Sequence, residues 1–227
     1  MHGDVETVTP PYDPEVERLA ALPVSVLTDV IDRLGHRSQA MNHGIRPLDL
    51  SAASLAGRAF TITAAASSEV PANPYEHEIA AVDATPPGAV VVLATGACLD
   101  AAVWGELLMT RMLARGGVGV ITDGGIRDTA EIRRVRTPSF AAAITPRDSM
   151  GRLLVTGWDE PVECAGVRVS PGDLVRCDED GVVVIPKALA AEALAAAETK
   201  LALEHVVRDG LERGDSAADL FDRHGIL

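Results

Sequence analysis

The sequence predicts a single α/β domain whose sheet mixes parallel and antiparallel strands. The first observation behind this fold class is alternation: short β-branched runs bounded by glycine and proline alternate with segments whose apolar residues have helical spacing. The second is composition, because the 227 residues are 47% hydrophobic and 23% charged, which is typical of a globular domain able to bury its own core. The third is continuity, since no internal repeat or low-complexity linker divides residues 1–227.

The N-terminal segment is expected to begin as a loose arm over residues 1–13 and to continue as two helices. The first helix is predicted to start near Pro14. The second follows Ser25, whose hydroxyl suits an N-cap, and Gly35 supplies its stop. The apolar residues of this second helix fall at helical spacing, at Leu27, Val30, Ile31 and Leu34.

The central segment predicts a strand–helix–strand unit. β-branched residues concentrate in three short runs, which we expect to be buried strands, at residues 59–63, 89–95 and 118–122. Between the last two runs, a helix is predicted that ends at the glycine pair Gly116-Gly117 and carries Leu108, Met112 and Leu113 on one face. Such a unit normally makes a right-handed crossover.

The C-terminal third predicts short strands followed by a long helix. Strands are expected over residues 162–186, with turns at 171–173 and 178–181. An alanine-rich helix is expected from about Lys187, and a polar tail follows it, so residues 187–227 form the C-terminal helix and tail. One face of this helix carries Leu194, Ala197 and Leu201.

Charge and composition limit the partners of the chain. The net charge of −13 argues against nucleic acid as a ligand, because phosphate binding needs clustered Lys and Arg. The cluster Arg133, Arg134 and Arg136 is better explained as a solvated helix end. No apolar stretch approaches the roughly 20 residues of a membrane span, so we expect no membrane partner. An anionic small molecule must then be held by a local device, such as one arginine, a helix N-terminus or a bound cation.

The cysteines and the N-terminus indicate a cytoplasmic protein. The three cysteines, Cys98, Cys164 and Cys177, are odd in number and contain no CxxC pair, so we expect reduced thiols instead of a disulfide framework or zinc site. The first residues are acidic and contain proline, unlike the basic and then apolar run of a signal peptide.

The chemistry is predicted to lie where two distant segments meet. Glu106 opens the central helix, and twenty residues separate it from Arg127 and Asp128. Those twenty residues run down the helix and return along the next strand, so the helix start and the predicted loop DGGIRD (123–128) should share the edge where α/β sheets bind ligands. In that loop, Gly124 and Gly125 are expected to allow a tight turn and close approach of a ligand.

The residue types at this edge suit an anionic substrate and a hard cation. The helix N-terminus near Gly105 offers free N–H groups to a carboxylate, and Arg127 can hold an anionic oxygen with two donors. Asp128 and Glu106 are hard oxygen donors suited to Mg²⁺ or Mn²⁺. Each also has a structural interpretation: Asp128 as the N-cap of the following helix, and Glu106 as a favourable charge in a first helical turn.

Other motifs are weaker. Glu76-His77-Glu78 is either a surface cluster or part of the site mouth, and the surface interpretation is favoured. Two lysines are present, Lys187 and Lys200, and both lie at or in the C-terminal helix. Their positions, distant in sequence from the predicted site, argue against lysine Schiff-base chemistry there and favour a divalent metal as the electrophile.

The segments WGELLMTRMLARGGVGVITDGGIRD and VECAGVRVSPGDLVRCDEDGVVVIP resemble the RraA-like family from about Ser25 to Pro186. This family contains metal-dependent aldolases that cleave 4-hydroxy-2-oxo acids and also protein regulators of ribonuclease E. The resemblance implies a three-layer β/β/α (swivelling-domain-like) fold and assembly as trimers or hexamers. It implies a divalent-metal-dependent pyruvate aldolase with oxaloacetate decarboxylase activity. A non-catalytic, ribonuclease-binding regulator on the same fold is the alternative.

The resemblance also implies residue roles. Residues Gly105, Glu106, Leu107 and Leu108 would cradle the substrate carboxylate. Arg127 would bind the substrate, Asp128 would ligate the metal, and Glu106 would hold metal-bound water. The sequence departs from the aldolases of the family after the next strand, where a lysine-rich stretch is replaced by TPRDSMGRL with Arg147 and Arg152. The substrate is therefore left open.

Overall fold

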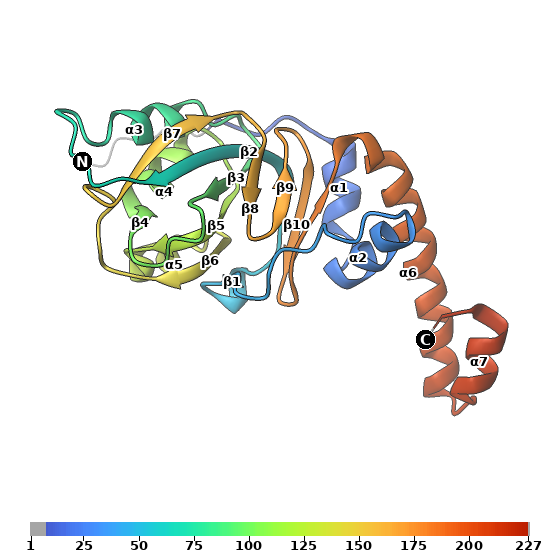
Figure 1. Cartoon of the computed structure of the whole chain (residues 1–227). Helices are drawn as coiled ribbons and strands as arrows, with labels where there is room; N and C mark the ends of the chain where they lie inside the picture. Colours follow the sequence, from blue (N-terminus) through green and yellow to red (C-terminus); the bar gives the residue numbers. More distant parts are fainter. Residues whose placement is uncertain (1–7, 227) are drawn as a thin grey trace.

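The computed structural model describes residues 8–226 (Figure 1). Part of the predicted loose arm, residues 1–7, lies outside this range. Residues 8–13 form neither helix nor strand and lead into helix α1 (Pro14–Ala20). The side chain of Asp13 caps this helix by accepting hydrogen bonds from the N–H groups of Glu15 and Val16, so the predicted start at Pro14 is confirmed.

A nine-stranded mixed sheet forms the centre of the molecule. Strands β2, β3, β5 and β6 run parallel, β4 adds in parallel to β5, and the remaining pairs are antiparallel. The small hairpin β8–β9 stands apart from this sheet. The strands are β1 (Arg46–Pro47), β2 (Leu55–Ala66), β3 (Ala89–Ala94), β4 (Ala102–Trp104), β5 (Gly119–Ile126), β6 (Ser139–Ile144), β7 (Leu153–Trp158), β8 (Val162–Cys164), β9 (Val167–Val169), β10 (Leu174–Asp178) and β11 (Gly181–Ile185).

Strand β3 shows why the central strands are apolar without alternation. All six of its residues are buried. Val91 and Leu93 face one core cluster, whereas Val90 and Val92 face another. A strand covered on both faces has no solvent side on which to place polar residues.

The covering elements make the predicted three layers. One face of the sheet packs against helices α3 (Glu76–Asp83) and α4 (Glu106–Ala114), and α5 (Thr129–Val135) lies beside α4. The other face packs against the β8–β9 hairpin and against β10 and β11, the strands at one end of the same sheet. The α/β fold class with N- and C-terminal helices is confirmed.

A third core cluster joins the two ends of the chain. Helices α1, α2 (Val24–Arg33) and α6 (Ala190–Glu212) pack on the outer side of β10 and β11, where Leu174, Val183 and Ile185 are fully buried. Figure 1 shows these three helices together at one end of the sheet, with the far half of α6 extending away from it. Within residues 8–226, no helix combines the length and apolar character that crossing a bilayer requires.

Two predictions about the terminal helices are wrong. Helix α2 begins at Val24, and its first N–H donates to the carboxylate of Asp178 at 2.8 Å, so Ser25 lies inside the helix and does not cap it. The predicted polar tail contains a helix, α7 (Ala217–His224), which Ser216 caps. Helix α7 packs Leu220 against Val207 of α6. This helix buries so few apolar residues that it is hard to recognise in a polar sequence. The C-terminal helix itself begins with a 3₁₀ turn at Lys187–Leu189.

The predicted loop at residues 123–128 is also corrected. Strand β5 continues through Gly124 and Gly125 to Ile126, and all its residues are buried. A side chain at Gly124 would lie 2.5 Å from the hydroxyl oxygen of Thr95, and one at Gly125 would lie 2.6 Å from the carbonyl oxygen of Ala101. These glycines are therefore required by close packing of neighbouring backbone, and not by a turn.

Asp123 fixes the segment that faces those glycines. Its carboxylate accepts hydrogen bonds from the Thr95 N–H at 2.6 Å, the Thr95 hydroxyl at 2.9 Å and the Ala97 N–H at 3.0 Å. Asp123 is buried. This buried acid therefore ties the chain that follows β3 to strand β5.

We expect Asp123→Ala to lower the free energy of unfolding by about 3 kcal/mol, because buried donors left without an acceptor cost about 1–3 kcal/mol each. Urea unfolding measures the change. Asp100→Ala is the matched control, since Asp100 is an exposed acid whose ion pair with Arg147 contributes about 0–1 kcal/mol. Equal stabilities of the two variants would contradict this role of Asp123.

Candidate active site

The pairing of β4 with β5 brings the predicted site segments together. Trp104, the last residue of β4, is paired in parallel with Ile126, the last residue of β5. The Arg127 N–H continues the ladder by donating to the Trp104 carbonyl at 3.0 Å. The start of α4 and the residues after β5 therefore leave the sheet side by side.

Asp128 has a backbone conformation that turns its side chain towards α4. Its φ of 56° lies in the left-handed region. The side chain makes no capping hydrogen bond to α5, although Asp128 occupies the N-cap position. One carboxylate oxygen instead accepts from the Glu106 N–H at 3.2 Å. The capping interpretation of Asp128 therefore describes its backbone and not its carboxylate.

Gly105 is the point of closest approach. A Cβ on this residue would lie 2.6 Å from an Asp128 carboxylate oxygen and 3.1 Å from Cγ of Arg127. The φ of Gly105 is −155°, which any residue can adopt. Glycine is therefore needed here for space alone, and a side chain would displace the Asp128 carboxylate.

A cavity of about 290 Å³ opens beside these residues, and we call it the α3–α4 pocket. Its wall combines one cation, two acids and several apolar side chains. The exposed Leu107 and Ile79 are among the apolar residues. The residues lining the pocket are Tyr75, Glu78, Ile79, Val103, Gly105, Leu107, Leu108, Arg127 and Asp128.

The N-terminus of α4 presents backbone donors to this pocket. The Glu106 N–H is engaged by Asp128, whereas the N–H groups of Leu107 and Leu108 have no acceptor within residues 8–226. Unpaired N–H groups in a first helical turn attract an anion. The Glu106 side chain accepts a hydrogen bond from Thr110 at 3.0 Å and does not line the pocket, so its predicted role with metal-bound water remains a prediction.

Arg127 is held by an acid that the sequence analysis did not identify. Its guanidinium lies 3.1 Å from one carboxylate oxygen of Asp148. The Tyr75 hydroxyl donates to the other Asp148 oxygen at 2.5 Å, and this hydrogen bond raises the pKa of Tyr75. Asp148 lies in the segment TPRDSMGRL, between the two arginines named above, Arg147 and Arg152. Arg147 pairs with Asp100 instead, and Arg152 donates to backbone carbonyls.

Glu78 corrects the surface interpretation of the cluster Glu76-His77-Glu78. Its residue is 8% exposed and lines the α3–α4 pocket. The Ser149 hydroxyl donates to one Glu78 carboxyl oxygen at 2.6 Å. Burial raises the pKa of Glu78 against the opposing effect of this hydrogen bond. A signal was present in the sequence, because Ala81 and Val82 lie three and four residues later and place Glu78 on the buried face of a helix.

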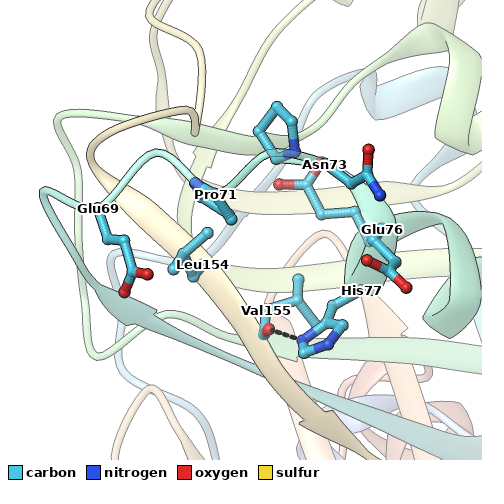
Figure 2. A pocket seen from close by; sticks show the side chains of 9 residues that line it. Glu69, Pro71, Asn73, Glu76, His77, Leu154 and Val155 are labelled. Carbon is cyan, nitrogen blue, oxygen red and sulfur yellow. Dashed lines mark hydrogen bonds between the residues drawn. The ribbon is translucent and has the colours of Figure 1, made fainter.

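The other two residues of the cluster line a neighbouring cavity of about 260 Å³ (Figure 2). His77 and Glu76 are both exposed. The Nδ1 atom of His77 lies 2.9 Å from the carbonyl oxygen of Val155 on strand β7. Glu78 also lines this second cavity, so it separates the two.

The donor set of the pocket fits a weakly held hard cation. In the part of the chain that the structure describes, no three His, Cys, Asp or Glu side chains are arranged to hold a metal ion. The side chain of Asp128 is 47% exposed at the pocket wall and has one carboxylate oxygen without a partner among residues 8–226. Mg²⁺ is usually bound in this way, through one or two carboxylates with waters and substrate oxygens completing its shell. Mg²⁺ or Mn²⁺ held by Asp128 therefore agrees with the residues present.

The fold and the pocket define an α/β protein whose candidate binding site lies at the C-terminal ends of parallel strands. A profile of the RraA-like family, described as Aldolase/RraA, matches residues 24–184. The chain belongs to the RraA-like family.

The similar proteins include one named as an aldolase and one described as a member of the RNase ES inhibitor RraA family. Protein DlpA of Legionella pneumophila is 31% identical over 105 residues, which are 46% of this chain and 17% of that protein. A putative 4-hydroxy-4-methyl-2-oxoglutarate aldolase of Halalkalibacterium halodurans is 27% identical over 82% of this chain and 83% of its own length. Streptomyces coelicolor RraAS2, described as an unusual member of the RNase ES inhibitor RraA family, matches with a TM-score of 0.80 and 28% identity over 87% of this chain and 98% of that chain.

Glu78 should make stability depend on pH. Because its pKa in the folded chain is raised above the ordinary value of 4.5, the folded chain keeps a proton that the unfolded chain loses, and stability falls as pH rises through this window. We expect Glu78→Gln to remove this component, so that the free energy of unfolding declines less between pH 4 and neutral pH. Urea unfolding across this range tests it, with Glu76→Gln as the exposed control. An unchanged slope in Glu78→Gln would refute the assignment.

Proposed function

We propose that this protein is a divalent-metal-dependent pyruvate aldolase that cleaves a 4-hydroxy-2-oxo acid into pyruvate and a second oxo compound. The observation that carries the proposal is the convergence of Arg127, Asp128 and the free N–H groups of α4 on one pocket. Oxaloacetate decarboxylation passes through the same pyruvate enolate, so the same residues would support it. The aldolase name of the Halalkalibacterium relative supports the proposal.

Substrate binding follows from the positions of these groups. The substrate carboxylate lies at the α4 N-terminus, where the Leu107 and Leu108 N–H groups donate to it. Arg127 reaches the 2-oxo oxygen, and its pairing with Asp148 fixes the guanidinium beforehand. Preorganised donors of this kind stabilise charge that develops in the transition state.

A divalent cation, when held by Asp128, would supply electrophilic stabilisation of the enolate oxygen. The alternative electrophile would be a lysine, and both lysines lie outside the pocket. Lys200 forms ion pairs with Asp29 and Glu204 beside α2, and Lys187 begins the turn before α6. Neither residue lines the α3–α4 pocket.

The cleavage breaks the C3–C4 bond of the substrate. The C4 hydroxyl passes its proton through a water to the Glu106 carboxylate, which returns it to solvent. The C4 carbonyl forms, and the bonding pair moves to C3 as the pyruvate enolate. Arg127 holds the negative charge on the enolate oxygen. Protonation at C3 then yields pyruvate, so the proton lost and the proton gained balance.

The second candidate function is a non-catalytic regulator that binds a ribonuclease. The similarity to RraAS2 favours it. An assay that couples pyruvate to lactate dehydrogenase separates the two: EDTA-sensitive turnover of oxaloacetate or a 4-hydroxy-2-oxo acid supports the aldolase, whereas no turnover with Mg²⁺ or Mn²⁺ supports the regulator.

We expect Arg127→Ala to lower kcat/KM by about 100- to 1,000-fold, which is the usual cost of removing one oxyanion donor. The coupled assay measures it. Arg134→Ala is the control, because Arg134 pairs with Glu131 on the exposed side of α5 and should leave turnover unchanged. Wild-type turnover in Arg127→Ala would refute the role of Arg127.

We expect Asp128→Ala to abolish metal-stimulated turnover, because it removes the carboxylate that holds the cation. Isothermal titration of Mn²⁺ into each protein adds a reading that does not depend on activity, and Asp128→Ala should bind Mn²⁺ at least tenfold more weakly. Glu131→Gln is the exposed acidic control on α5. Equal Mn²⁺ affinity in wild type and Asp128→Ala would remove Asp128 from the proposal.

A further inference from the structure

We infer that Glu78 is the acid that protonates the enolate carbon in the α3–α4 pocket. This inference rests on the proposed function and adds a residue that the sequence analysis placed on the surface. It follows from three observations: the position of the carboxyl group, its hydrogen bonding, and the charge balance of the pocket wall.

Position places Glu78 within reach of a bound substrate. Glu78 lines the same cavity as Arg127, Asp128 and Gly105, yet it comes from α3, which packs against α4 across the pocket. The groups proposed to bind the substrate come from the strand ends. Glu78 therefore approaches the enolate from a different wall of the pocket. From there an acid can protonate the enolate carbon without displacing the groups that bind the substrate oxygens.

Hydrogen bonding orients the carboxyl group. Its Oε1 atom accepts from the Ser149 hydroxyl at 2.6 Å. Its Oε2 atom has no hydrogen-bond partner within residues 8–226 and is not among the atoms sealed from solvent. One oxygen is thus anchored, and the other is free to carry the proton.

The charge balance favours a neutral Glu78. The positive charge of Arg127 is matched by Asp148 at 3.1 Å, and Asp128 contributes a further negative charge. An ionised Glu78 would make the wall repel the anionic substrate. The charged and polar groups around Glu78 are Asp148 and Ser149 from the segment before β7, Arg127 and Asp128 from the residues after β5, and Tyr75 from the start of α3. The apolar residues around it are Leu107 and Leu108 of α4 and Leu154 and Val155 of β7.

The proton transfer completes the cleavage. After the C3–C4 bond breaks, Glu78 gives the proton on Oε2 to C3, a C–H bond forms, and the enolate electrons restore the C2 carbonyl of pyruvate. Glu78 is left as a carboxylate. It regains a proton from the solvent of the second cavity (Figure 2), which it also lines, while product still fills the α3–α4 pocket.

The test is the exchange of pyruvate methyl protons for deuterium, followed by ¹H NMR in D₂O with Mg²⁺. This reaction forms and protonates the enolate without any C–C cleavage. Glu78→Gln keeps the size and the acceptor for Ser149 but cannot give up a proton. We expect its exchange rate to fall about 100-fold or more, the usual contribution of an acid or base. Glu76→Gln, on the same helix but outside the α3–α4 pocket, should exchange at the wild-type rate.

A second variant separates proton transfer from a structural role. The hydrogen bond from Ser149 lowers the pKa of Glu78, so Ser149→Ala should raise that pKa and keep the acid protonated to higher pH. Because exchange begins when the Glu78 carboxylate removes a methyl proton, the exchange rate should rise as this group ionises. We expect that rise to move to higher pH in Ser149→Ala, with circular dichroism confirming that the variants are folded.

The outcomes distinguish this inference from the proposed function. Exchange by wild type with full exchange by Glu78→Gln overturns the role of Glu78 and leaves the aldolase proposal intact. An unmoved pH profile in Ser149→Ala also counts against Glu78. No exchange and no turnover of any 2-oxo acid by wild type overturns both.

Discussion

The parallel pairing of β4 with β5 is the constraint on which the candidate site depends. Three residues of β4 end at Trp104, and the chain turns into α4 at Gly105 directly beside the end of β5. The contact succeeds because Gly105 has no side chain in the space that Asp128 occupies. The buried carboxylate of Asp123 ties the chain after β3 to β5, and the two following glycines allow neighbouring backbone to approach this strand closely. The site is therefore a product of sheet packing more than of loop conformation.

Much of this arrangement could be predicted from the sequence. The β-branched run of β3 and the helix that follows it predict a crossover, and the crossover predicts that Gly105 and Arg127 share one edge. The predictions that were wrong concern where helices and strands begin and end. The pair Gly124 and Gly125 predicts a turn, because a glycine pair is typical of one. Sequence spacing does not show that a Cβ would collide with Thr95 at Gly124 and with Ala101 at Gly125. Likewise α7 depends on a contact with Val207, which local sequence does not contain.

The residues missed at the site have a common origin. Asp148 and Glu78 lie outside the strand–helix–strand unit. The packing of α3 places Glu78 in the pocket wall, and the segment before β7 brings Asp148 to Arg127. A buried acid on a helix face is visible as a pattern, but its partner Ser149 is 71 residues away in the chain. Contacts between side chains that lie far apart in the chain are the part of a site that a single sequence does not predict.

The left-handed backbone at Asp128 limits how this site can evolve. Glycine, asparagine, aspartate and histidine adopt that conformation most readily, so the backbone itself favours a short side chain at the position. Replacement by glutamate would keep a carboxylate but would strain the chain where it leaves β5. New metal selectivity would therefore have to arise from the surrounding residues, or from remodelling the exit of the strand as a whole.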